Sequence, residues 1–158
     1  MLTLSQDLIF SISIVFISFI VGMVMTALVR KTNFYSDKLS NLNFINSKFT
    51  NKVIGVGVVK WIVKNTFFRY LNPDLKFGKR MSISDVRSIR DKMTKSEIDH
   101  LFAFTFVTIF VIRAFIDQNY SLAFIILLVN ILMNLNPSLL QQQNKRRIDK
   151  LLYRVEKG

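Results

Sequence analysis

The chain's single histidine is the first place to look for chemistry near neutral pH. His100 carries the only side chain whose ordinary pKa lies close to neutrality, and Glu97 precedes it by three residues. In a helix this spacing puts both side chains on one face, about one turn apart. A carboxylate in that position can orient an imidazole that acts as a general base or acid. The pair is therefore a candidate catalytic site.

The same residues also have a purely structural interpretation. Thr94 and Glu97 have the spacing of a capping box, in which a side chain at the start of a helix and one three residues later satisfy the first backbone N–H groups. His100 would then be an interfacial residue whose ring reaches water. Both interpretations remain open from the residue types.

Polar residues near the end of the chain form the second candidate group. Asn130 and Asn134 share a helix face inside an apolar block, where amide groups need partners, and Asn130 is expected to join two spans. Beyond them comes an amide-rich and then basic run: Gln141, Gln142, Gln143, Asn144, Lys145, Arg146 and Arg147. These bases suit a phosphate-bearing ligand, and they equally suit a positive-inside topology signal.

Several kinds of site are excluded or disfavoured by composition. The chain has no cysteine, which excludes disulfides, a thiolate nucleophile and a cysteine zinc site. One histidine excludes an all-histidine metal cage, and the sequence contains neither a phosphate-cradling glycine loop nor a nucleophile elbow. We therefore expect no metal and no cofactor.

Three apolar blocks must position these residues. They cover residues 8–29, 98–116 and 122–140, and each approaches the length of a helix that crosses the ~30 Å hydrocarbon core. The third is long enough only if it runs through Pro137, so a partly re-entrant hairpin is the alternative. The blocks predict an all-α integral membrane protein, a single domain with about three transmembrane helices plus amphipathic interfacial helices.

The segments between and after the spans are basic. Residues 30–97 form a cytoplasmic or interfacial segment, in which residues 51–71 combine lysines with Trp61 in the manner of an interfacial helix. Asn72-Pro73-Asp74 predicts a break, after which a helix starts at Ser82 or restarts near Lys95. The tail, residues 141–158, has the spacing of a surface amphipathic helix.

The distribution of bases predicts the topology. Of the 22 Lys and Arg residues, fifteen lie in residues 30–95, six lie in the tail, and the turn at residues 117–121 has none. The positive-inside rule then places the middle segment and the tail in the cytoplasm and the amino terminus outside. With a net charge of +12 arranged around apolar spans, we expect anionic lipid headgroups as partners and no nucleic acid.

The order of these features is similar to that of a known family. Glu97-Ile-Asp-His100, then Asn134 with a proline nearby, then Gln141-x-x-Asn144-Lys-Arg-Arg147 resemble the motifs of the glycosyl-4,4'-diaponeurosporenoate acyltransferase family. In these bacterial membrane proteins of the staphyloxanthin-type carotenoid pathway, E-x-x-H and N-x-P followed by Q-R-Y-N-R-x-R recur. The resemblance spans about residues 43–152. Pro137 comes one position late, and Gln142-Gln143 stands where the family has Arg-Tyr.

The resemblance implies an enzyme of the bacterial inner membrane. It would esterify a hydroxyl of a glycosylated isoprenoid lipid, using a cytoplasmic acyl thioester as co-substrate. His100 would be the general base and Glu97 would orient it. The implied substrate-binding residues are Asn134 and Gln141 for the sugar or the thioester carbonyl, Asn144 within the same motif, and Lys145, Arg146 and Arg147 for phosphate of the acyl carrier. The alternative is a non-enzymatic accessory subunit of a larger inner-membrane complex, in which these polar residues face a partner helix.

Overall fold

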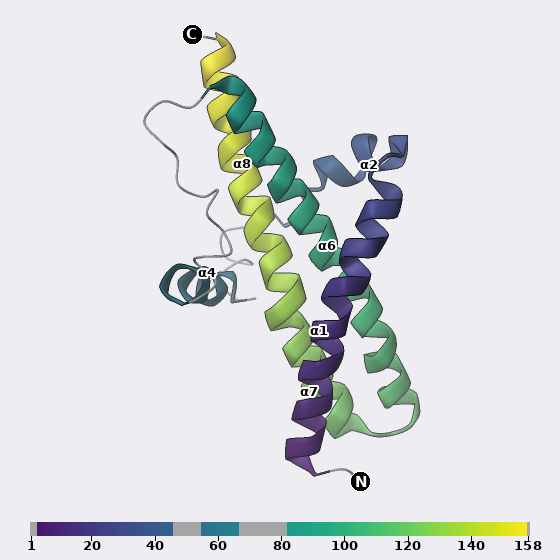
Figure 1. Ribbon diagram of the computed structural model, residues 1–158. Helices are drawn as coiled ribbons and strands as arrows, with labels where there is room; N and C mark the ends of the chain where they lie inside the picture. The colour runs from purple at the N-terminus through teal and green to yellow at the C-terminus, as the bar shows by residue number, and fades with distance from the viewer. Residues whose placement is uncertain (1–2, 46–54, 67–81, 158) are drawn as a thin grey trace.

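The fold consists of three long helical rods that pack along one another (Figure 1). The computed structural model describes residues 3–45, 55–66 and 82–157, and the regular structure in these ranges is all helical. The rods are α1 (Leu4–Val29), α6 (Ile83–Ile116) and an unbroken run of α7 (Tyr120–Asn130), the π-helix η3 (Ile131–Leu135) and α8 (Asn136–Lys157). Each is long and apolar enough to cross a membrane, which confirms the predicted fold class.

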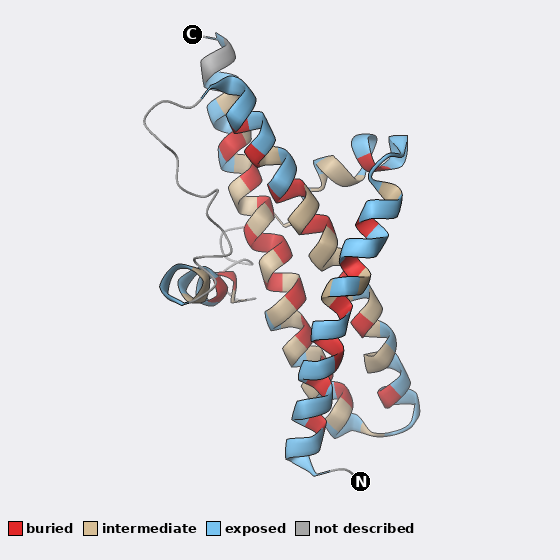
Figure 2. Ribbon diagram, in the orientation of Figure 1, coloured by how far each residue is buried: buried red, intermediate tan, exposed pale blue. Residues whose placement is uncertain are grey.

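Helix α1 packs through a face of small side chains. Its buried positions include Ser11, Ser18 and Thr26, whereas its outer face exposes large apolar residues such as Phe16 and Leu28 (Figure 2). A Cβ added to Gly22 would lie 2.1 Å from the backbone oxygen of Asp99 on α6. Only glycine fits at this crossing, and small residues are what let two helix backbones approach so closely.

Helix α6 begins at Ser82 and runs without interruption into the apolar block. The Ser82 hydroxyl accepts a hydrogen bond from the backbone N–H of Asp85, whose carboxylate accepts one from the N–H of Ser82, and this completes a capping box. Thr94 lies inside the helix, where its hydroxyl donates to the Arg90 carbonyl at 3.0 Å. The alternative start near Lys95 and the Thr94–Glu97 capping box are therefore wrong.

The third rod is continuous, so a re-entrant hairpin does not form. The turn after α6 contains Gln118 in the left-handed region, and the Asn119 side chain caps α7, which runs antiparallel to α6. The Asn130 amide donates to the Phe104 carbonyl at 3.1 Å, so it does join two of the long helices. The tail expected as a separate surface helix continues α7 and η3, and its first half packs against α6.

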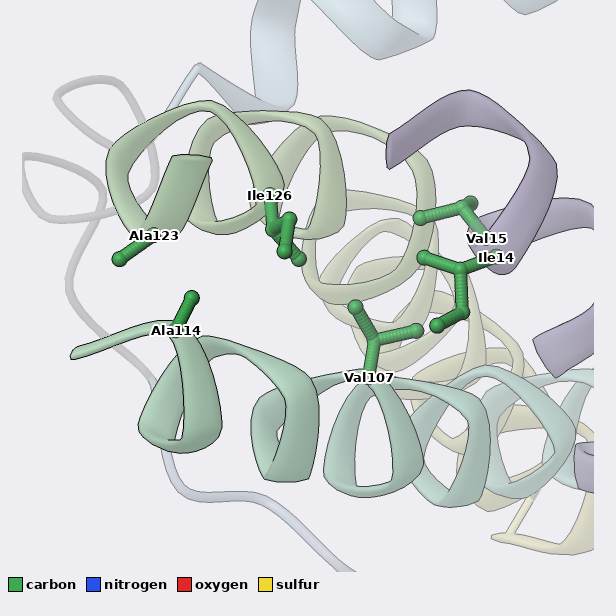
Figure 3. Close-up of a cluster of buried hydrophobic side chains, with 6 residues drawn as sticks. All are labelled: Ile14, Val15, Val107, Ala114, Ala123 and Ile126. Atoms are coloured by element: carbon green, nitrogen blue, oxygen red, sulfur yellow. The ribbon is translucent and has the colours of Figure 1, made fainter. Parts of the chain in front are cut away.

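Two apolar clusters hold the rods together at opposite ends. Where all three meet, the cluster consists of Ile14, Val15, Val107, Ala114, Ala123 and Ile126 (Figure 3). At the other end α6 and α8 extend past α1 and pack on each other through Val86, Ile89, Met93 and Ile148. The polar residues of interest lie between these two clusters.

Shorter helices lie beside the rods. α2 (Asn33–Asp37) and the 3₁₀ helix η1 (Leu39–Asn41) follow α1, in the segment expected to be cytoplasmic or interfacial. α4 (Val56–Asn65) is seen nearly end-on in Figure 1 and therefore crosses the direction of the rods. It packs Val56 and Val59 on Leu139 and Leu140 of α8. The rest of the expected 51–71 helix and the break at 72–74 lie outside the described residues.

Candidate functional site

Glu97 forms a buried ion pair with a residue of the basic tail. Its carboxylate Oε2 accepts a hydrogen bond from Lys145 Nζ at 2.6 Å, and the two side chains are 0% and 4% exposed. Lys145 Nζ also donates to the backbone carbonyl of Ser40 at 3.0 Å. The pair thus fixes α6 to α8 and ties both to the segment around η1. Gln142, one turn before Lys145, lies beside Glu97.

His100 contacts residues of two other helices. Its half-buried imidazole lies against the Asn134 side chain of η3 and packs edge-on against Phe19 of α1, with ring centroids 5.5 Å apart. The imidazole Nδ1 is buried and has no hydrogen-bond partner among the residues that the structure describes. The expected neighbour of His100 was Glu97, but the carboxylate pairs with Lys145, and Asn134 takes the position beside the ring.

Asn134 is held in place by two hydrogen bonds. Its amide nitrogen donates to Ser18 Oγ at 3.2 Å and to Asn130 Oδ1 at 2.9 Å. Its carbonyl oxygen Oδ1, which is buried, has no partner in the described part of the chain. This oxygen is therefore free to accept a hydrogen bond from the imidazole or from a ligand.

A polar stripe runs along the third rod and faces the interior. It consists of Asn130, Asn134, Ser138, Gln142 and Lys145, none more than 3% exposed. The π-helix η3, whose wider turn often marks a functional position, lies within this stripe. The sequence prediction included Asn130, Asn134 and Lys145, but it missed the roles of Ser138 and Gln142.

The remaining predicted residues divide between interior and surface. Gln141 is partly buried and its Oε1 lacks a partner within the described ranges, while Asn144 is also partly buried. Arg146 donates to Asn43 Oδ1 at 2.6 Å and to the Ile45 carbonyl at 3.0 Å. Arg147 is exposed and, with Lys150, Leu151 and Arg154, lines a groove of about 350 Å³. Lys145 and Arg146 thus bind the chain itself, and Arg147 faces outward.

Tyr35 of α2 has an electrostatic link to this end of α6. Burial raises the pKa of its phenol, Arg30 opposes that effect, and the nearby acidic residues Asp99, Asp91 and Glu97 add to it. The phenol therefore stays protonated at neutral pH and can act only as a neutral hydroxyl. No group of three or more potential metal ligands occurs among the described residues.

Comparison with known proteins gives one match. The model of the glycosyl-4,4'-diaponeurosporenoate acyltransferase family matches residues 31–154, which is most of the chain. The chain belongs to this acyltransferase family. No curated protein and no solved structure matches the chain.

The acyltransferase family match covers every site residue that the sequence predicts. Glu97 and His100 of the E-x-x-H motif lie on α6, and Asn134, Gln141 and Asn144 of the second motif lie on the third rod that packs against it. The match excludes α1 up to residue 30, although α1 supplies Ser18 and Phe19 to the surroundings of Asn134 and His100. In this chain the two motifs meet where α6 packs against η3 and α8.

Proposed function

We propose that this chain transfers an acyl group from a thioester donor to a hydroxyl of a glycosylated isoprenoid lipid. The observation that carries the proposal is the juxtaposition of His100 and Asn134, two residues 34 positions apart, on facing helices. A histidine with an unpaired ring nitrogen is suited to general-base catalysis. The family supplies the class of substrate.

The chemistry needs one base and one means of polarising the thioester. His100 takes the proton of the acceptor hydroxyl as its oxygen bonds to the thioester carbon, the C–S bond breaks, and the thiolate leaves with that proton. Asn134 orients the imidazole, because its own amide is fixed by Ser18 and Asn130. Gln141 supplies an amide toward the reacting carbonyl, where a donor stabilises the developing oxyanion.

The ion pair of Glu97 with Lys145 has a positioning role in this proposal. It holds the motif-bearing stretch of α6 against α8, and so fixes the height of His100 relative to Asn134. For the acyl carrier, the exposed groove at Arg147, Lys150 and Arg154 offers phosphate-binding bases, with Arg146 and Asn144 beside it on the same helix. We place this groove and the tail in the cytoplasm, and the three rods in the bacterial inner membrane.

The test uses the purified protein in nanodiscs with a long-chain acyl-coenzyme A and a glycosylated carotenoid acceptor. His100→Gln should lower kcat by about 10²- to 10⁴-fold, the usual contribution of a general base. Thr105→Ala, which removes an exposed hydroxyl on the same helix, is the matched control and should keep the wild-type rate. A wild-type rate in folded His100→Gln would remove His100 from the mechanism.

A further inference from the structure

Three polar groups one turn beyond the His100–Asn134 contact lack partners. Ser138 Oγ, both polar atoms of the Gln142 amide, and Glu97 Oε1 are buried and form no hydrogen bond of good geometry with any described residue, although the Gln142 amide lies close enough to Glu97 to act on its carboxylate as a donor. Their residues are 0%, 1% and 0% exposed. Leaving such groups unpaired in the interior costs free energy, so each is expected to have a partner in the functional state.

The position of these groups follows from contacts on either side of them. Asn134 lies against His100, and Gln142 lies beside Glu97, so the intervening turn that carries Ser138 faces the stretch of α6 between Glu97 and His100. Ser138, Gln142 and Glu97 therefore lie within about one helical turn of one another, next to the proposed catalytic pair.

Ser138 differs from most buried hydroxyls of the described helices. Ser11, Ser18 and Thr94 each donate to a backbone carbonyl about one turn earlier, which is how a hydroxyl inside a helix is usually satisfied. Ser138 makes no such bond, and neither does Thr26 on α1. The Ser138 hydroxyl remains available to a ligand as donor or acceptor.

The combination of groups favours a neutral ligand rich in hydroxyls. A serine hydroxyl and a primary amide each donate and accept, and a carboxylate oxygen only accepts, so together they complement the O–H groups of a sugar. A phosphate is disfavoured because Glu97 Oε1 would face it, and the free bases lie further along α8. We propose that Ser138, Gln142 and Glu97 form the subsite that binds the sugar of the acceptor lipid, an inference that rests on the proposed acyl transfer.

The experiment measures equilibrium binding of two radiolabelled probes, octadecyl glucoside and octadecanol, to the full-length protein in nanodiscs. Gln142→Leu should weaken binding of the glucoside about tenfold and leave octadecanol binding unchanged, because one hydrogen-bonding group for the sugar is lost. Gln143→Leu, a change of the adjacent and partly exposed amide, is the matched control and should bind both probes like the wild type. Ser138→Ala removes only the hydroxyl and should weaken glucoside binding in the same direction.

The result decides between the subsite and its competitors. Wild-type glucoside binding in both Gln142→Leu and Ser138→Ala would overturn the inference, as would an equal loss of glucoside and octadecanol binding. His100→Gln should bind the glucoside normally while losing acyl transfer. If the wild type binds the glucoside through Gln142 but transfers no acyl group, the proposed function fails and the subsite stands. If acyl transfer proceeds and Gln142→Leu keeps the wild-type KM for a glycosylated acceptor, the sugar subsite is wrong and the proposed function stands.

Discussion

Two parts of the polar stripe bury the same kinds of atoms in different states. At the α7 end, Asn130 donates to the Phe104 carbonyl and its own carbonyl accepts from Asn134. Toward α8, Ser138 and Gln142 are equally buried but form no hydrogen bond of good geometry with the described residues, and beyond them Lys145 is paired with Glu97. The difference teaches that a buried amide in this bundle links two helices where it is paired, and is a candidate ligand contact where it is not.

The buried ion pair gives the largest test of this comparison. Lys145→Met leaves Glu97 charged and unpaired in the interior, and breaking such a pair from one side costs about 3–5 kcal/mol of unfolding free energy. Replacing both residues, as in Glu97→Leu with Lys145→Met, should recover most of that loss. Unfolding by denaturant in a fixed detergent measures both. If Lys145→Met leaves the free energy of unfolding unchanged, the ion pair does not hold α8 against α6.

The crossing of α1 and α6 gives the second test, because it fixes α6 one residue away from His100. Gly22→Ala should lower the free energy of unfolding by about 1–3 kcal/mol, since the added Cβ would meet the Asp99 carbonyl and force the helices apart. Gly57→Ala is the matched control, because no atom lies within 4 Å of its added Cβ. That change lies inside α4 and should stabilise the protein by up to about 1 kcal/mol. Equal effects at both glycines would contradict a tight crossing.

Side-chain truncations in the paired and unpaired parts of the stripe test the comparison directly. Asn130→Ala should cost about 0.6 kcal/mol and at most about 1.7 kcal/mol, the average and the maximum for hydrogen bonds between membrane helices, and leave the KM for the glycosylated acceptor unchanged. Ser138→Ala should leave stability unchanged or slightly improved, because it removes an unpaired hydroxyl, and should raise that KM. Unfolding curves and initial rates on the same preparations separate the two outcomes. A raised KM in Asn130→Ala together with a loss of stability in Ser138→Ala would contradict these roles for the paired and unpaired groups.

Much of the fold could be predicted because three apolar blocks are long enough to cross a bilayer and must then be helical. The start of α6 could not, since Ser82 with Asp85 and Thr94 with Glu97 offer equally good capping boxes. Only the packing of α6 on α8, which buries Val86, Ile89 and Met93, selects the first. Local sequence carries no information about that long-range contact.

The candidate site was predictable in its residues and less so in its pairings. Glu97 and His100 share a helix face, but the partner that decides the role of Glu97 lies 48 residues away on α8. The positions of Ser138 and Gln142 on the polar face could have been predicted, because they continue the four-residue spacing of Asn130 and Asn134 along a segment expected to be helical. The π-helix has no sequence signature of its own, and it changes the register by which these positions face α6.

The smallest expected effect concerns the depth in the bilayer at which Ser138 and the neighbouring α4 lie. Trp61 is the only tryptophan, is 64% exposed, and lies on α4, which packs on Leu139 and Leu140 beside Ser138. If α4 rests at the headgroup boundary, lipids brominated near the headgroup should quench Trp61 fluorescence more than lipids brominated near the chain end. Trp61→Phe should change unfolding free energy by less than about 0.5 kcal/mol, because an exposed position contributes little packing. Stronger quenching from the chain end would place α4 deep in the hydrocarbon, where a sugar-binding subsite at the level of Ser138 would be out of reach of a headgroup.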